Sequence, residues 1–323
     1  MRLEEIQFIS HVPRDGRTLL MQPWFNHESN QWHMYFERSP GDFIEIAMVD
    51  YYHGIYFSSA PAAEGDIEIP LANLVAQHLT FKGIPKVLFS LVDDFNMLCA
   101  CLKKISILSS VSDNYSTFLI QSEIEYLFSL VRAKFDIMQM LIKKIAILLT
   151  PQDGGRPISA LPDSFAAIAL SGDQVRSEDE IITKWNLPHP LAHFYHASAA
   201  VFRQVRSVRV AIEHYGKNVP AVFVTNQGLG IQTSGLALWG EMEVWSMHEI
   251  QANGIGSVRS LTSFLALYCI DSCSSLERAL RSIIDPGLLP PAVISESTIF
   301  FRNPLSSELL GLEGVIRSPW ISN

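Results

Sequence analysis

The chain has 323 residues, of which 48% are hydrophobic and 18% are charged. These proportions exclude a disordered chain, and the length is enough for one large or two ordinary domains with a buried core. The formal net charge of −9 argues against a protein that coats nucleic acid by broad phosphate neutralisation, but it leaves room for a local basic site.

Residues 1–66 predict a small β-rich region. Short aromatic and β-branched runs at 33–37 and 43–49 are typical of strands, and turn-forming residues at 39–42 separate them. Residues 51–58 predict a third strand. The aromatic side chains of this region could stack on a ligand, although packing in the core and across strands is their commoner role. They are Trp24, Phe25, Trp32, Tyr51, Tyr52 and Tyr56.

From Pro70 onward, hydrophobic residues recur at steps of three and four, which is the period of a helix face. The pattern predicts a first long helix over residues 88–105 and a second over residues 124–149. Pro151 and the glycines at 154–155 stop the second helix, because neither residue type favours its continuation.

Residues 162–185 predict two short helices, broken at residues 171–172. Pro188 and Pro190 then open a third long helix, since proline is tolerated in a first turn, and Gly216 ends it. A fourth long helix is predicted from about residue 257 to residue 283.

Residues 221–225 and 229–232 predict a β-hairpin, and residues 298–301 predict a strand that returns to a sheet. The predicted fold class is α+β, a predominantly helical antiparallel bundle with a small antiparallel sheet. The sheet is expected to contain the N-terminal strands, the hairpin and the returning strand.

Three parts of the chain are expected. Residues 1–66 form the small β-rich N-terminal region. Residues 67–285 form the helical bundle, with a hairpin insertion at residues 221–245. Residues 286–323 form a C-terminal extension that packs back on the body.

The expected location is the cytoplasm, with no membrane partner. No basic segment followed by an apolar run opens the chain, and no apolar stretch approaches the ~20 residues that span a bilayer. The cysteine spacings do not match structural zinc sites, so reduced core cysteines are expected, with no metal and no cofactor. The cysteines are Cys99, Cys101, Cys269 and Cys273.

A homodimer is expected because the second long helix carries apolar residues beyond one stripe, namely Leu130, Ile137 and Leu141. The alternative is that another part of the same chain covers this surface. Sequence spacing alone leaves both interpretations open.

The third long helix ends in an arginine-rich segment with a histidine. Arg203, Arg206 and Arg209 follow one another at three-residue spacing, and His214 precedes the glycine that stops the helix. Arginine binds phosphate through a fixed fork of donors, and histidine is suited to proton transfer near neutral pH. The alternative is a solvated face whose cations interact with the helix dipole.

An ideal helix turns about 100° per residue. His214 then lies about 20° from Arg203, about 20° from Ser207 and about 80° from Arg206, while Arg209 is about 140° away. Arg203, Arg206 and Ser207 are therefore the candidate phosphate-binding residues beside His214. Arg209 joins this face only if the last turn unwinds or a second subunit supplies it.

The segment Arg209-Val-Ala-Ile-Glu-His214 resembles the hallmark of the higher eukaryote and prokaryote nucleotide-binding (HEPN) superfamily, an arginine followed after four to six residues by a histidine. The motif of that family stands at the end of the third long helix of a bundle. The resemblance covers roughly residues 85–285 and rests on this one motif and the helix order.

The resemblance implies a metal-independent endoribonuclease that acts as a dimer in a defence or stress system. Arg209 would bind the scissile phosphate, and His214 would act as general acid or base. Val210 departs from the polar residue that active members commonly carry after the arginine. The alternative is therefore a noncatalytic nucleotide-binding, dimerisation or scaffold module, with RNA or a nucleotide as the partner of either form.

Arg132 and Asp136 on the second long helix are candidate supporting residues of the same site. They lie four residues apart, so an ordinary ion pair along a helix is the simpler interpretation. His189, His193 and His196 could share one face of the third long helix. No carboxylate lies between the first two, so a metalloprotease-like zinc site is not predicted.

Overall fold

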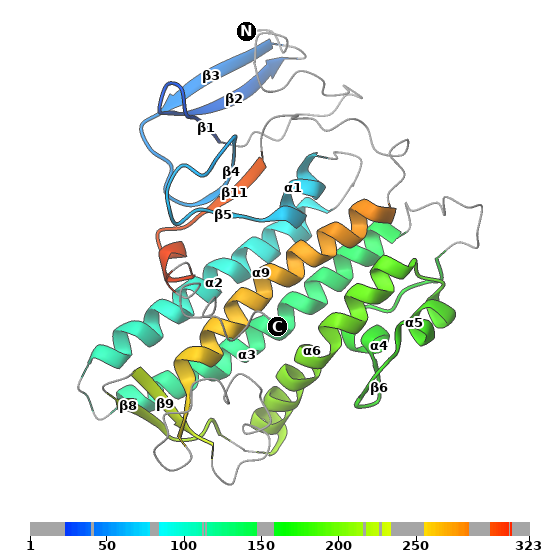
Figure 1. Ribbon diagram of the computed structural model, residues 1–323. Coiled ribbons are helices and arrows are strands. Elements are labelled where there is room, and N and C mark those ends of the chain that lie inside the picture. Colours follow the sequence, from blue (N-terminus) through cyan, green and yellow to red (C-terminus); the bar gives the residue numbers. More distant parts are fainter. Residues whose placement is uncertain are drawn as a thin grey trace.

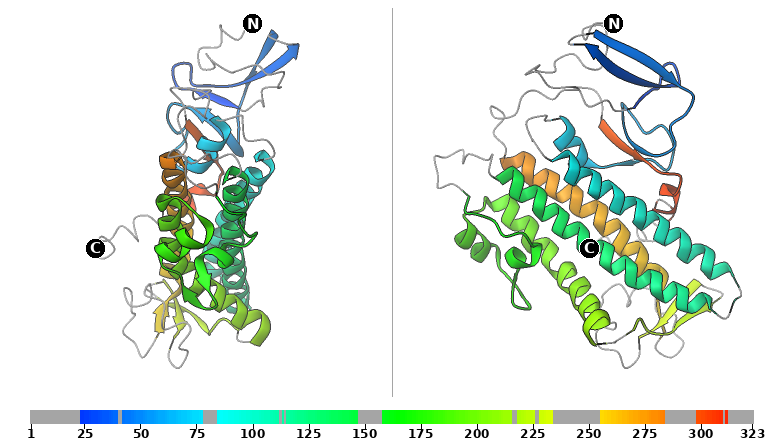
Figure 2. Two further views of the ribbon diagram at one scale, coloured as in Figure 1. Left: turned by 90° about the vertical axis from the view of Figure 1, so that its right-hand side faces the viewer. Right: turned by 180° about the vertical axis from the view of Figure 1, so that it is seen from behind.

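The protein has a mixed α+β fold in which most strands gather at one end of a set of long helices, while a smaller group that includes β8 (Val222–Thr225) and β9 (Gly228–Gln232) lies near the other end (Figures 1 and 2). The computed structural model describes most of the chain. The described residues are 23–39, 42–77, 84–111, 113, 115–146, 158–215, 218–225, 228–233, 255–283, 298–309 and 311.

The largest sheet in the described part of the chain has six strands in the order β3-β2-β1-β4-β11-β5. The pairs are antiparallel except for β1 and β4, which run parallel with Trp24 opposite Phe57. The strands are β1 (Trp24–Asn26), β2 (Gln31–Ser39), β3 (Asp42–Met48), β4 (Gly54–Ser58), β5 (Ile67–Glu68) and β11 (Thr298–Arg302).

Alternation along β4 and β11 separates two apolar clusters. Successive side chains of a strand point to opposite faces. The main core contains Ile55 and Phe57 of β4 and the two neighbours of Phe300 in β11. A smaller cluster on the other face contains Tyr56 and Phe300, together with Phe25 and Trp32. The sheet is therefore buried on both faces at its centre, and these aromatic residues serve packing.

The sheet agrees with the sequence prediction in one respect and differs in two. The returning strand at residues 298–301 is confirmed, because β11 pairs with β4 and β5. The prediction that residues 221–232 join this sheet is wrong. The hairpin β8 (Val222–Thr225) and β9 (Gly228–Gln232) instead pairs with β10 (Ile255–Ser257) in a separate sheet. The sheet is also mixed and larger than the small antiparallel one expected.

Four long helices lie side by side in the described chain (Figure 1). They are α2 (Pro85–Ser110), α3 (Ser116–Ala146), α6 (His189–Tyr215) and α9 (Val258–Ile283), and the shorter α1 (Pro70–Gln77) packs on α2 and α9. The four predicted long helices are thus confirmed. The expected stop signals of these helices lie outside the described residues, at 147–157, 216–217 and 284–290.

Contacts between helices fix their directions. Cys101 of α2 contacts the backbone of Glu123 of α3, whereas Asp94, earlier in α2, lines a small cavity with Lys134, later in α3, so these helices are antiparallel. The ring centres of Phe135 in α3 and Phe202 in α6 are 5.4 Å apart. Gln139, later in α3, accepts a hydrogen bond from Tyr195, earlier in α6, so these two helices are also antiparallel.

Two short helices stand between α3 and α6, as predicted. Ser164 caps α4 (Phe165–Ala169) by accepting from Ala167 N, and Ser177 with Glu180 forms a capping box at α5 (Glu178–Trp185). The hairpin β6 (Leu170–Ser171) and β7 (Gln174–Val175) joins them, and Gly172 adopts φ 62° in its turn. A left-handed φ of this kind favours glycine.

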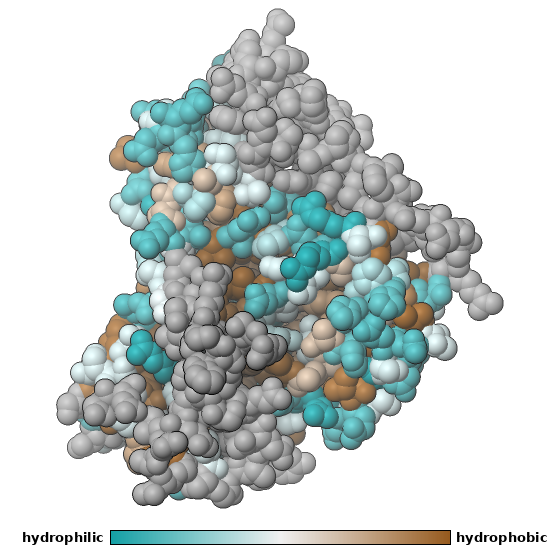
Figure 3. Space-filling model, in the orientation of Figure 1, coloured by the Kyte–Doolittle hydropathy of each residue, from teal (hydrophilic) through white to brown (hydrophobic). Residues whose placement is uncertain are grey.

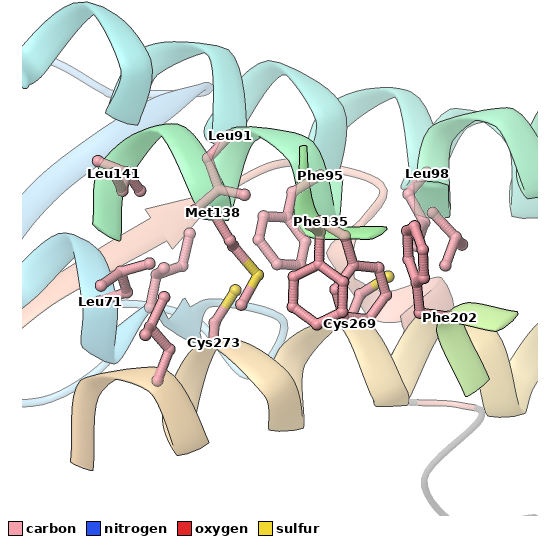
Figure 4. Close-up of a cluster of buried hydrophobic side chains, with 14 of the residues drawn as sticks. Leu71, Leu91, Phe95, Leu98, Phe135, Met138, Leu141, Phe202, Cys269 and Cys273 are labelled. Atoms are coloured by element: carbon pink, nitrogen blue, oxygen red, sulfur yellow. The ribbon is translucent and has the colours of Figure 1, made fainter. Parts of the chain in front are cut away.

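Aromatic and sulfur-containing side chains fill the space between α2, α3, α6 and α9 (Figure 4). Phe135 is fully buried, and the centre of its ring lies 4.9 Å from the ring centre of Phe165 and 6.2 Å from that of Tyr268. The four cysteines are free thiols in this core, as predicted, and burial raises the pKa of Cys99 and Cys273 to about 12.

The apolar residues that suggested a dimer surface on α3 are covered within the chain. Leu141 is fully buried and Leu130 is 7% exposed, while Ile137 packs against the same core. Leu130 lines a small cavity with residues of α2 and α9, so these helices cover it. The inference of a homodimer from these three residues was therefore wrong, because the chain supplies its own covering helices.

None of the helices in the described part of the chain is both long enough and apolar enough to cross a membrane. The helices instead carry polar faces. On the view in Figure 3, hydrophobic residues appear in small groups between hydrophilic ones.

Candidate functional site

Helix α6 carries the predicted site in its last two turns. The helix continues to Tyr215, so Arg209 and His214 both belong to it. The side chains of residues 213–215 lie outside the described residues, and so does Gly216. The backbone therefore places the motif at the C-terminal end of a long packed helix.

The arginines of α6 differ in their surroundings. Arg206 forms a long ion pair of 3.8 Å, from Nη1 to Oδ1 of Asp173 in the β6–β7 turn. Arg203 and Arg209 are half-buried, and Ser207 is exposed. The predicted phosphate-binding residues thus lie on an accessible part of α6, with one partner contributed by the small hairpin.

The regular course of α6 decides between two interpretations of the motif. Because the helix does not unwind before Tyr215, the backbone positions of Arg209 and His214 lie about 140° apart around its axis. The interpretation in which the last turn unwinds is therefore wrong. In a single chain the two residues of the motif lie on different sides of α6.

Arg132 and Asp136 form the ion pair that was the simpler interpretation, at 3.4 Å between Nη2 and Oδ2. Asp136 also accepts a hydrogen bond from the backbone N–H of Phe165 at 3.3 Å. This carboxylate therefore links α3 to the first turn of α4.

The histidines at the start of α6 meet a carboxylate from another helix. Glu178 of α5 contacts His193 Nδ1 at 2.8 Å and His189 Nε2 at 3.2 Å, one carboxylate oxygen for each ring. These contacts lower the pKa of Glu178, with the hydrogen bond to His193 as the main cause. His196 Nδ1 lies 2.8 Å from the carbonyl oxygen of Arg176 instead. In the part of the chain that the structure describes, no cluster of three or more His, Cys, Asp or Glu residues could hold a metal ion.

No family model, no curated protein and no solved structure shows a significant match to this chain.

A buried lysine lies between α3 and α9. Lys134 is only 2% exposed and donates hydrogen bonds to the hydroxyl of Ser272 and, at 3.2 Å, to the carbonyl oxygen of Cys269. Its ammonium lies 4.4 Å from the centre of the Phe135 ring, a cation–π contact. Asp94 of α2 lines the same small cavity, and its Oδ2 is buried without a hydrogen-bond partner among the described residues.

Burial, the larger cause, and the nearby Asp93 together raise the pKa of Asp94 to about 6, although the ammonium of Lys134 opposes both effects. An unfolded aspartate loses its proton near pH 4. Between these values the folded chain holds more protons than the unfolded chain, so this group lowers the stability as the pH rises from about 4 to about 6.

Replacing Asp94 with asparagine is therefore expected to stabilise the protein at pH 7 by about 1 kcal/mol, because solvent screens part of the effect at this partly exposed carboxyl, and to change little at pH 4. Urea unfolding of Asp94→Asn and the wild type between pH 4 and pH 7 measures the difference. Asp93→Asn, at an exposed neighbour, should keep most of the wild-type pH dependence. Parallel stability curves for the wild type and Asp94→Asn would show that the carboxyl titrates alike in both states.

Sequence reasoning missed two polar features that depend on tertiary contacts. Glu178 belongs to an acidic run at the start of α5, which reads only as a favourable first turn. The second missed feature is the contact of the buried Lys134 with Ser272 of α9. Its only local signal is the polar run from Asp271 to Ser275, which interrupts the apolar pattern of α9 but does not identify the partner helix.

Proposed function

We propose that this chain is a HEPN-like protein and that it cleaves RNA without a metal ion as a homodimer. The observation that carries the proposal is the position of Arg209 and His214 in the last turns of α6, the third of four long packed helices. This is the arrangement that the resemblance requires. The finer fold description that goes with it is a predominantly helical antiparallel bundle, and the proposed setting is cytoplasmic defence or stress.

Each residue of the site has a distinct role in the proposed reaction. Arg209 binds the scissile phosphate with its guanidinium fork. His214 moves a proton to or from the ribose hydroxyl or the leaving oxygen. Arg203, Arg206 and Ser207 contact the neighbouring phosphates of the RNA. No metal is required, since the proton transfer and the phosphate contacts come from side chains.

The positions of Arg209 and His214 make a second copy necessary. About 140° separates them around α6 in one chain, so a complete site combines Arg209 of one copy with His214 of the other. A two-fold dimer generates two such sites, because each contact is repeated by symmetry.

Exposed apolar side chains support a dimer at this end of the molecule. Tyr115, Phe118 and Leu119 at the start of α3 are 69%, 68% and 50% exposed, and Val224 of β8 is 54% exposed. Gln121 binds the carbonyl oxygens of residues 219 and 220, which follow the end of α6 closely. Burial of these side chains between two copies would bring their α6 ends towards each other, and exposed apolar surface of this kind commonly marks an interface.

The direct test is incubation of the purified protein with single-stranded RNA and transfer RNA in buffer containing EDTA. Cleavage that persists in EDTA is expected, together with a dimer in sedimentation at micromolar concentration. A strict monomer would remove the shared site. An RNA-inert dimer would remove the catalytic part of the proposal.

The second candidate is a noncatalytic RNA- or nucleotide-binding, dimerisation or scaffold module, and Val210 favours it over catalysis. Such a module is expected to bind RNA without cutting it, with an affinity that falls as salt rises because arginines release phosphate counterions. Fluorescence anisotropy with a labelled RNA at two salt concentrations separates this candidate from the nuclease.

A further inference from the structure

A groove between α6 and α9 lies apart from the motif at the end of α6. Its volume is about 380 Å³, which falls within the range of small-molecule sites, roughly 300–1,000 Å³. Pro190, His193 and Phe194 of α6 line one wall, and α9 lines the other wall between Tyr268 and Ser282.

The groove carries two opposite charges on one wall. Asp271 and Arg278 are its only carboxylate and its only guanidinium among the described residues. They are seven residues apart on α9, which places them on one helix face and about 10 Å apart along the axis. Arg278 donates to the hydroxyl of Ser275 at 3.1 Å, and in the described chain neither charge has an ion-pair partner within 4.0 Å.

Beside the two charges, the groove is lined by small apolar groups and by hydroxyls. Ala197 and Ala279 leave space, and Ser275 has a hydroxyl group that accepts from Arg278 and can still donate its own hydrogen. Such a group can serve the C=O of a peptide bond. Glu178 holds Nδ1 of His193 at 2.8 Å, which restrains the imidazole on the α6 wall.

We propose that this groove binds a short peptide with free termini, about three residues long. Its α-ammonium group lies at Asp271 and its α-carboxylate at Arg278. An extended chain of three residues spans about 10 Å, which matches the separation of the two charges. The carboxylate suits the two-pronged geometry of a guanidinium. Phe194 of the opposite wall provides the apolar contact for a central side chain.

The test compares two tripeptides by isothermal titration calorimetry with the full chain. The probes are Gly-Phe-Gly with free termini and the same peptide with an acetylated N-terminus and an amidated C-terminus. The free peptide is expected to bind at least about tenfold more tightly, since hydrogen bonds to charged groups are stronger than neutral ones. Equal binding of the two peptides, or no binding of either at 10 mM ligand (about the weakest affinity worth following), would overturn the proposal.

Variants assign the two ends. Arg278→Gln should remove the preference for a free carboxylate, and Asp271→Asn should remove the preference for a free amine. Arg281→Gln is the matched control, because Arg281 pairs with Glu277 at 2.5 Å and does not line the groove. An equal loss of affinity in the control would show that general charge, and not the groove, attracts the peptide.

Adenosine monophosphate serves as a second probe, because it also carries an anionic group far from a hydrogen-bonding amine. Tight binding of this nucleotide that Arg278→Gln abolishes, with no binding of the tripeptide, would overturn the peptide assignment. His214→Ala should leave peptide binding unchanged, so this proposal and the proposed RNA cleavage can fail separately.

Discussion

His214→Ala is expected to lower the rate of RNA cleavage by two to four orders of magnitude, because general acid–base catalysis contributes about 10²–10⁴-fold. Arg209→Lys should lower it as well, since lysine keeps the charge but cannot make the paired contacts of a guanidinium to phosphate. Gel analysis of a labelled RNA under single-turnover conditions measures both rates.

The matched control is His196→Ala. His196 stands on the same helix, is exposed, and contacts the carbonyl oxygen of Arg176. This variant should cleave RNA at the wild-type rate. If His214→Ala cleaves as fast as His196→Ala, His214 has no part in proton transfer. If it instead lowers the melting temperature of an inactive protein, the histidine is structural.

Mixing two inactive variants tests the shared site. A heterodimer of His214→Ala and Arg209→Ala contains one site with both residues intact and one with neither. Random exchange of subunits at equal concentrations should therefore restore about a quarter of the wild-type activity. No restoration, although exchange is verified by mass spectrometry of differently tagged subunits, would contradict a site built from two copies.

Phe135→Ala is expected to destabilise the fold by about 3–5 kcal/mol, the usual cost of removing a buried aromatic ring. Phe135 has no exposed surface and contacts aromatic rings from α4, α6 and α9. It also faces the ammonium of Lys134. The substitution therefore leaves a cavity where four helices meet. Urea unfolding at pH 7, followed by circular dichroism, measures the change.

Met140→Ala is the control for this effect. Met140 lies on the same helix and is 44% exposed, so its loss should cost no more than about 0.5 kcal/mol. A similar loss of stability in both variants would mean that the shared helix α3, and not the aromatic cluster, determines the response.

The long helices could be predicted because their signal is local. The hydrophobic period of α9, for example, predicted residues 257–283 and the helix covers Val258–Ile283. The predicted break at residues 171–172 is equally local, because Gly172 takes a left-handed turn conformation there. Strand β1 was missed because it has only three residues, too few for an alternating pattern to stand out.

The partners of the strands could not be predicted in the same way. Hairpin β8–β9 was correctly located, yet it pairs with β10, which lies more than twenty residues further along the chain. Strand β11 joins β4 across more than two hundred residues. Pairing of this kind depends on where the helices place the strand edges, and no short window of sequence contains that information.

The candidate site shows the same division. The sequence by itself determined that Arg209 and His214 lie in one helix and about 140° apart, because a regular helix turns about 100° per residue. Only the tertiary structure decided that Leu130 and Leu141 are covered within the chain, that Glu178 meets two histidines, and that Asp271 and Arg278 line a groove. Helical angles follow from bonded neighbours, whereas burial and grooves follow from the packing of segments far apart in the chain.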